Sequence, residues 1–230
     1  MTQHFLSGSP PVALTLRHSP RARRISLRVS GIDGRVTLCV PRGVTEADAL
    51  DFAQSREEWL RTQLARQPEH VRIAPGLEVP VEGRLMRIAP VSGRAVTLGR
   101  DTIGVPGPAG RTATRLEAWL KARARDRLSA ASDRYAAQLG RRYSRITLRD
   151  TRSRWGSCSS NAALSYSWRL IMAPPEVLDY VAAHEVAHLS EMNHSPAFWA
   201  VVTRLFPAHD APRKWLRREG VALHRYRFRD

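Results

Sequence analysis

Apolar and polar residues alternate along the first forty positions of the chain. Apolar side chains recur at every second position in three short runs, separated by His18-Ser19-Pro20 and by residues 31–34. Because successive side chains of a strand point to opposite faces of a sheet, this period predicts three antiparallel strands. Their apolar positions are Val12, Leu14, Leu16, Ile25, Leu27, Val29, Val36, Leu38 and Val40.

The apolar spacing then becomes helical. Thr45 is a typical N-cap and Asp48 falls in the first turn, so we expect a helix over residues 46–66. A second, longer helix is expected over residues 112–139. Its apolar residues recur near helical spacing, and Gly140 suits the helix end. Short strand candidates lie between these two helices, at residues 77–81, 85–88, 95–98 and 102–105.

The remainder of the chain predicts two more strands, at residues 145–148 and 163–171, and then a helix that opens at Pro174-Pro175. Proline and glycine cluster without periodicity over residues 104–110, which makes this segment the best candidate boundary. We therefore expect an α+β fold. Its β-rich N-terminal part, with one helix, covers residues 12–106, and a second part covers residues 111–230.

Composition narrows the class of protein. Of the 230 residues, 43% are hydrophobic and 25% charged, which is typical of a globular chain. No apolar run reaches the roughly 18 residues that a membrane span needs, so we expect no membrane partner. The two cysteines, Cys39 and Cys158, lie far apart and form no disulfide framework. This usage indicates a reducing compartment and a cytoplasmic protein.

The net charge of +16 would attract phosphate backbones or nucleotides. Only Lys121 and Lys214 are lysines among the 37 basic residues, and such a bias for arginine also arises in GC-rich genomes. That bias explains the choice of arginine but not the excess of basic over acidic residues. Both readings therefore stay open. The arginines of the second predicted strand are candidate polyanion contacts or, alternatively, its solvated face: Arg21, Arg23, Arg24 and Arg28.

The segment His184-Glu185-Val186-Ala187-His188 places two histidines four residues apart. Residues at this spacing lie one above the other on one face of a helix, where a single Zn²⁺ can bridge two imidazoles. Glu185 would then lie beside the zinc-bound water as its general base. The apolar residues around the motif support a helix with a buried stripe.

A third zinc ligand is predicted at His194. Catalytic zinc usually takes three protein ligands and keeps one position open. On a continuous helix His194 would be rotated about 120° away from His188, so it reaches the metal only if the helix ends between them. Asn193 tolerates the left-handed conformation of a helix end, and Ser195-Pro196 suits the start of a new helix. We therefore expect a turn at this point.

Three segments of the sequence together resemble the YgjP-like metallopeptidase family. They are Arg154-Trp-Gly-Ser-Cys-Ser-Ser160, Trp168-Arg-Leu-Ile-Met-Ala-Pro-Pro175, and the HExxH helix with His194-Ser-Pro-Ala-Phe-Trp199. The basic residues 21–24 and the helix with Trp59 fit as well. The resemblance thus covers nearly the whole chain and implies a single YgjP-like domain overall.

This resemblance implies a zincin-like catalytic core, in which an antiparallel or mixed sheet packs on the HExxH helix. It is similar to the SprT-type peptidases, which act on DNA-bound proteins. By position, His184, His188 and His194 resemble the zinc ligands of the family and Glu185 its base. A nucleotide-directed activity has also been attached to the family, so the resemblance leaves the substrate open.

The expected chemistry is hydrolysis. Zn²⁺ held by three neutral imidazoles lowers the pKa of its water from about 15.7 to near 7, and Glu185 takes the proton. Peptide hydrolysis also needs a donor for the oxyanion, for which Tyr166, Arg154 and His209 are candidates. For His209 the surface-loop histidine is the favoured interpretation. Glu191 is either a carboxylate that orients a histidine or an exposed helix end.

Three functions remain in competition at this point. The favoured one is a zinc metallopeptidase that cuts a protein or peptide, near nucleic acid or apart from it. The second is a metal-dependent nucleoside-triphosphate pyrophosphatase, against which stands the lack of a phosphate-cradling glycine loop. The third is a basic nucleic-acid-binding protein with a structural metal, although structural zinc usually has four ligands.

Overall fold

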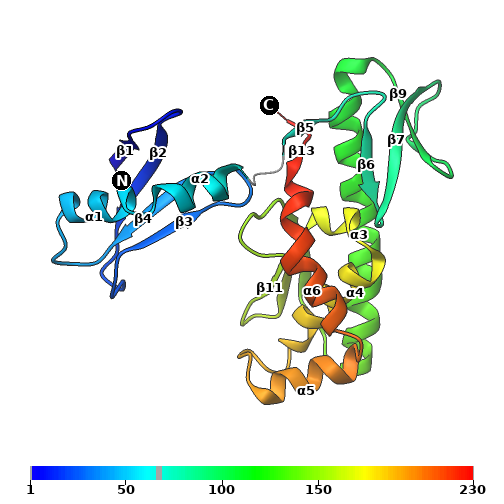
Figure 1. The fold of residues 1–230 in the computed structure, drawn as a ribbon. Coiled ribbons are helices and arrows are strands. Elements are labelled where there is room, and N and C mark those ends of the chain that lie inside the picture. Colours follow the sequence, from blue (N-terminus) through cyan, green and yellow to red (C-terminus); the bar gives the residue numbers. More distant parts are fainter. Residues whose placement is uncertain (1, 66–68, 230) are drawn as a thin grey trace. The chain divides into compact units, whose positions relative to one another are not determined.

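The chain folds into two compact units, residues 1–69 and 70–230 (Figure 1). The computed structural model describes residues 2–65 and 69–229. Each unit has its own hydrophobic core. Within the described residues, no helix is both long and apolar enough to span a bilayer.

The N-terminal unit is a four-stranded sheet in the order β1-β2-β4-β3, with α1 and α2 packed on its apolar face. The expectation of three antiparallel strands is wrong in one respect, because β2 and β4 run parallel. The apolar residues of β4 are fully buried while those of β3 are half-buried, so the more apolar strand takes the centre of the sheet. The strands are β1 Thr2–Leu6, β2 Val12–His18, β3 Ser26–Val29 and β4 Val36–Val40.

Two helices, α1 (Glu46–Gln54) and α2 (Glu57–Ala65), replace the single helix expected over residues 46–66. The N-cap is confirmed, since the Thr45 side chain accepts a hydrogen bond from the Asp48 amide. The break follows Ser55, whose hydroxyl donates to the Phe52 carbonyl and so competes with the helical hydrogen bonds. The expected last residue, Arg66, lies outside the described residues.

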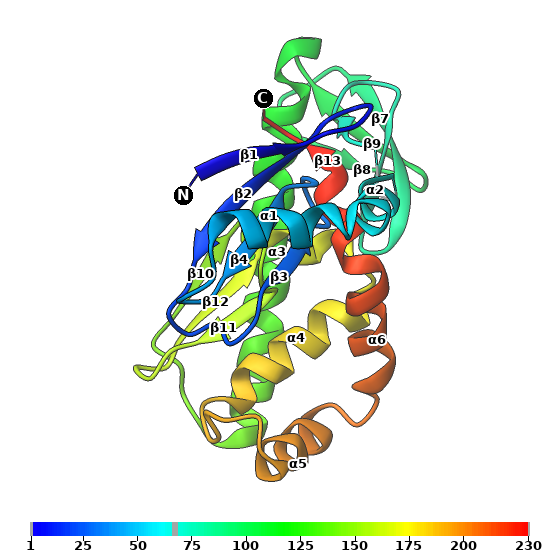
Figure 2. The same cartoon turned by 60° about the vertical axis from the view of Figure 1, so that its left-hand side comes forward.

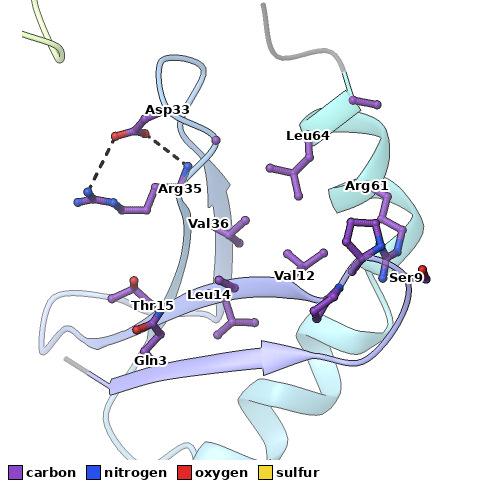
Figure 3. Close-up of a pocket in the computed structure, with 15 residues that line it drawn as sticks. Gln3, Ser9, Val12, Leu14, Thr15, Asp33, Arg35, Val36, Arg61 and Leu64 are labelled. Carbon is purple, nitrogen blue, oxygen red and sulfur yellow. Dashed lines mark hydrogen bonds and ion pairs between the residues drawn. The ribbon is translucent and has the colours of Figure 1, made fainter. Parts of the chain in front are cut away.

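A pocket of about 670 Å³ lies in the N-terminal unit where the start of β2, the β3–β4 turn and the end of α2 meet (Figure 3). Leu14, Val36 and Leu64 line it with apolar surface. Asp33 and Arg35 pair within the turn at its rim. None of the predicted catalytic or metal-binding residues lines this pocket.

The second unit begins with a four-stranded sheet in the order β6-β7-β9-β8, which confirms the four strand candidates. The helix α3 (Thr112–Leu139) follows and ends at Gly140 in the left-handed conformation, as expected. Ile103 and Val105 share one core with Leu116, so the proline- and glycine-rich segment lies inside this unit and the division falls earlier, at residues 69–70. The strands are β6 Glu78–Val81, β7 Arg84–Val91, β8 Thr97–Leu98 and β9 Thr102–Pro106.

A three-stranded mixed sheet, in the order β10-β12-β11, follows α3. The strand expected over residues 163–171 ends early, and Trp168–Met172 is a 3-10 helix. The strand ends early because the next five residues are all buried, one after another. Among them, the buried Arg169 guanidinium binds Asp150 and two backbone carbonyls, which an alternating strand would not allow. The strands are β10 Arg145–Arg149, β11 Gly156–Cys158 and β12 Ala163–Ser167.

Three short helices complete the second unit beside α3 (Figures 1 and 2). α4 opens at Pro175, as predicted, and packs against α3, β11 and the two helices that follow it. Near the C-terminus, β13 (Tyr226–Arg227) pairs in parallel with β5 (Val71–Arg72). The helices are α4 Pro175–Ala187, α5 Pro196–Leu205 and α6 Asp210–Glu219.

Candidate metal centre

The helix α4 places His184, Glu185 and His188 at its C-terminal end. Most of its side chains are buried, because α3, β11, α5 and α6 pack around it. Along this end the three residues differ in exposure: Glu185 and His188 are buried, whereas His184 is half-buried. The helix therefore holds two imidazoles on a fixed support at the edge of the core.

The turn after α4 brings His194 back to the same place. The helix ends at Ala187, and the Ser190 and Glu191 amides donate to the Ala187 carbonyl. Asn193 does not have the positive φ that was expected of it, because the helix has already ended six residues earlier. The new helix is confirmed, since the Ser195 side chain accepts from the Phe198 amide.

The three histidines form a cluster whose nitrogen ligand atoms all lie within 4.8 Å of one another. The Nε2 atoms of His184 and His194 are 3.1 Å apart. Two nitrogens bound to one tetrahedral Zn²⁺ at about 2.0–2.1 Å lie about 3.3 Å apart, so this spacing fits a shared ion. Within the described part of the chain, this is the one cluster of at least three metal-binding side chains.

The ring of His188 is oriented by the backbone of the turn. Its Nδ1 lies 2.9 Å from the Glu191 carbonyl oxygen, which only accepts, so Nδ1 carries the proton. The lone pair for a metal is then on Nε2. Glu191 thus orients a histidine through its backbone carbonyl and not through its carboxylate.

Two aromatic side chains of α5 pack against the histidine cluster. The Phe198 ring is buried, and its centroid lies 4.4 Å from that of His188, 4.8 Å from that of His194 and 4.9 Å from that of His184. Trp199 packs on His184 and His194 at 5.9 and 6.2 Å. These apolar walls hold the rings in position for a metal before one arrives.

Burial and neighbouring charges keep two of the imidazoles neutral. Burial, followed by the charges of His188, His194 and Arg213, lowers the pKa of His184 to about 3. Burial also lowers the pKa of His188. Neutral imidazole is the form that binds a metal, so the site favours the protonation state of a ligand. Arg213, which the sequence did not single out, lies over Trp199 at 4.4 Å from the ring centroid.

Glu185 is a buried carboxyl group, only 5% exposed. Burial raises its pKa to about 8, although the charge of Arg154 acts in the opposite direction. Its position depends on Gly156 of β11: a Cβ there would lie 2.5 Å from Oε1 and 2.6 Å from Cγ of Glu185. Gly156 is a functional position that sequence reasoning missed, although a glycine inside a strand often marks such a close approach.

The predicted oxyanion donors lie in different surroundings. Arg154 is exposed, and its charge acts on Glu185. Tyr166 is 1% exposed, and its hydroxyl lies 3.0 Å from Ser132 Oγ of α3, inside the core. The hydroxyl of Tyr166 is therefore committed to a core hydrogen bond.

His209 lies in the turn between α5 and α6. Its Nε2 is 3.1 Å from Thr203 Oγ1, and its ring packs on Trp199 at 5.8 Å. Trp199 therefore contacts both His209 and the ring of His184. The four arginines considered as polyanion contacts belong to the N-terminal unit and are exposed: Arg21, Arg23, Arg24 and Arg28.

One family model and one solved structure are similar to this chain. No curated protein sequence matches the chain. Among solved structures, the crystal structure of the metallopeptidase zymogen of Pyrococcus abyssi abylysin is similar to 42% of this chain and 92% of its own, with 23% identity and a TM-score of 0.34. The model of the YgjP-like metallopeptidase domain matches residues 23–219, which include the histidine cluster and Glu185. The chain therefore belongs to the YgjP-like metallopeptidase family.

Proposed function

We propose that this protein is a zinc-dependent peptidase in which Glu185 is the general base. The observation that carries the proposal is the convergence of three imidazoles beside the buried carboxyl group of Glu185, which shares a helix turn with two of them. Three nitrogen ligands leave a fourth coordination position free for the reaction. A structural site would require a fourth ligand, and the described residues bring no further histidine, cysteine or carboxylate into the cluster.

The residues have separate tasks in this mechanism. The zinc ion would be held by His184, His188 and His194. As a Lewis acid it would activate water and polarise the substrate carbonyl. Glu185 takes a proton from the attacking water and returns it to the leaving amine, so that one water is consumed for each bond cut. Burial raises the pKa of Glu185, which makes its carboxylate a stronger base towards the attacking water.

The substrate is expected to bind along β11, which is an edge strand. Trp155 and Ser159 exchange backbone hydrogen bonds with β12, so the alternate residues Gly156 and Cys158 direct their N–H and C=O groups to the free edge. An extended peptide can pair with such groups. Because Gly156 also contacts Glu185, a peptide paired here passes the general base.

The test uses the full-length protein loaded with zinc and an unfolded protein substrate. Wild type should cleave it, chelator should abolish cleavage, and Glu185→Gln should lower the rate by about 10³-fold with zinc content unchanged. A Cys158→Pro variant, which removes one edge N–H, should raise KM about tenfold beside a Cys158→Ala control. Cleavage that survives in Glu185→Gln would exclude the base assignment, and hydrolysis of nucleoside triphosphates but not of protein would favour the pyrophosphatase alternative.

A second function is supported by the charge distribution of the N-terminal unit. Residues 2–44, the sheet and its loops, contain seven arginines and one carboxylate, whereas residues 45–65, the helices, contain five carboxylates and two arginines. Arg17 alternates with buried residues and Arg28 with half-buried ones, so both point away from the helices. Neither these two nor Arg21, Arg23 and Arg24 pair with a described carboxylate. We propose that this open face binds the phosphate backbone of a nucleic-acid duplex.

Salt dependence tests this second function. Binding of a labelled 20-base-pair duplex to the full chain should weaken with salt, and Arg17→Gln/Arg28→Gln should reduce the slope of log affinity against log salt by about 2. The double variant Arg56→Gln/Arg94→Gln removes the same charge from the helix side and from the second unit. Equal slopes in both double variants would place the binding on net charge alone and would contradict the assigned face.

A further inference from the structure

A groove of about 400 Å³ opens beside the metal ligand His188. Its three walls are the end of α3, the turn between β11 and β12, and the turn that follows α4. Cys158 of the edge strand lies in one wall and His188 in another, so the groove adjoins the path proposed for the substrate.

Two arginines are placed in this groove by the end of α3. Gly140 adopts the left-handed conformation with φ of 65°, and the Arg141 amide bonds back to the Ala136 carbonyl. This C-terminal cap turns the chain away from the helix axis. Arg141 and Arg142 therefore leave the helix next to the site, and both are exposed.

Both guanidinium groups lack a partner within the described residues. No ion pair or hydrogen bond joins the Arg141 or Arg142 side chain to a described group, and none of the groove's lining residues has a carboxylate. Nearby arginines behave differently: Arg134 pairs with Asp179, and Arg169 pairs with Asp150. Arg141 and Arg142 are thus free to bind an anion from outside.

We propose that Arg141 and Arg142 form a specificity subsite for an acidic side chain of the peptide substrate, close to the bond that is cut. This inference rests on the proposed peptidase function. A planar guanidinium binds a carboxylate in bidentate fashion. Leu189 and the 51%-exposed Met192 add apolar surface for the methylene groups of a glutamate, which favours an acidic peptide over the all-polar phosphates of a nucleotide.

The experiment compares matched peptides that differ only by Glu or Gln at each position around one scissile bond. Wild-type protein loaded with zinc should show a kcat/KM about tenfold higher for Glu at one position. The Arg141→Gln/Arg142→Gln variant should remove this preference while cleaving the Gln peptide at the wild-type rate. The Arg141→Glu/Arg142→Glu variant should prefer Lys at the same position.

A matched control removes two exposed arginines from the loops around β8, as Arg94→Gln/Arg100→Gln, and should retain the preference for Glu. Thermal midpoints and zinc content are measured for every variant, so that a folding defect is recognised. Cleavage without a preference for Glu in wild type, or a preference that persists in Arg141→Gln/Arg142→Gln, would overturn the subsite.

Failure of the peptidase proposal would look different. If zinc-loaded wild type cuts no peptide, the Glu and Gln peptides are tested for binding to Glu185→Gln by fluorescence anisotropy. Tighter binding of the Glu peptide that depends on Arg141 and Arg142 would support the groove without the activity. Equal binding of the two peptides, or loss of nucleoside-triphosphate hydrolysis in the Arg141→Gln/Arg142→Gln variant, would overturn the subsite.

Discussion

The two units of this chain treat ionisable side chains in opposite ways. Among the described residues, the second unit buries five acidic or basic side chains: Glu117, Arg169, Glu185, His188 and His224. Among the described residues of the N-terminal unit, every buried side chain is apolar or proline. Moving a charge out of water costs several kcal/mol unless a partner compensates it, so each such burial in the second unit requires an explanation.

The buried groups of the second unit divide into two kinds. Arg169 binds Asp150 and the carbonyls of Leu223 and Tyr226, and Glu117 binds Lys121 and Arg229, so their burial is compensated and structural. Glu185 makes no hydrogen bond or ion pair with a described residue. For the two buried carboxyl groups, the lack of a compensating partner, rather than burial itself, distinguishes the candidate site residue Glu185 from the structural Glu117.

The largest expected effect is on stability. Arg169→Met leaves Asp150 and two buried carbonyls without their donor and should lower the free energy of unfolding by about 3–5 kcal/mol. Arg28→Met, the same substitution on the exposed sheet face, should change it by less than about 0.5 kcal/mol. Urea unfolding followed by tryptophan fluorescence measures both. In a Trp59→Phe background the remaining five tryptophans report on the second unit for Arg169→Met, and the signal of Trp59, taken as the difference from the Trp59-containing chain, reports on the N-terminal unit for Arg28→Met. Similar losses would contradict the contrast between the units.

Acid should destabilise the second unit through His224. Burial and the charge of Arg169 lower its pKa to about 4, whereas in the unfolded chain it titrates near 6.5. The unfolded state therefore binds a proton first, and stability present above pH 6.5 is lost as the pH falls towards 4, on the order of 3 kcal/mol. His224→Gln should flatten this dependence relative to wild type when unfolding is measured from pH 7.5 to 4 with zinc present. An unchanged slope would exclude His224 as the source.

Activity should respond to the space at Gly156. In Gly156→Ala the new Cβ displaces the Glu185 carboxyl group, and kcat/KM should fall about 100-fold with zinc content unchanged. Gly110→Ala is the matched control, because a Cβ there meets no atom within 4 Å. The measurement is kcat/KM of both variants and of wild type on one peptide. Equal rates would mean that the position of Glu185 does not depend on this glycine.

The smallest expected effect compares the two kinds of buried carboxylate. In zinc-free protein at pH 7, Glu185→Gln should change the free energy of unfolding by less than about 1 kcal/mol, because Glu185 has no partner to lose. Glu117→Gln should cost about 1–3 kcal/mol, since it weakens the bonds to Lys121 and Arg229. Urea unfolding of both variants is the measurement. A larger loss for Glu185→Gln would show that its burial is structural.

Local signals were sufficient for several elements. The helical period and Gly140 predicted α3 with both of its ends, and Thr45 predicted the start of α1. The spacing of His184 and His188 predicted one face of α4, because helical geometry alone fixes it. The break between α1 and α2 was missed. The apolar pattern continues through it, and a hydrogen bond of the Ser55 side chain causes the break.

Other features depend on contacts between distant residues. The parallel pairing of β2 with β4, and the turn of Trp168–Met172 around the Arg169 contacts, follow from competition for the core. His194 was predicted, but the turn that places it was assigned to Asn193 and begins instead at Ala187. Neither Arg213 nor the groove of Arg141 has a sequence signal, because arginine is common throughout this chain.

The sequence by itself therefore determined the chemistry, which is three imidazoles and one carboxyl group. Helix geometry fixes the relative positions of His184, Glu185 and His188. Tertiary structure decided how that chemistry is arranged. Only the fold brings Gly156 against Glu185, Phe198 under the histidines and Arg141 beside His188, across separations of 29, 4–14 and 47 residues. The physical reason is that a residue's burial, and with it the pKa and orientation of the site, is set by neighbours that no local pattern specifies.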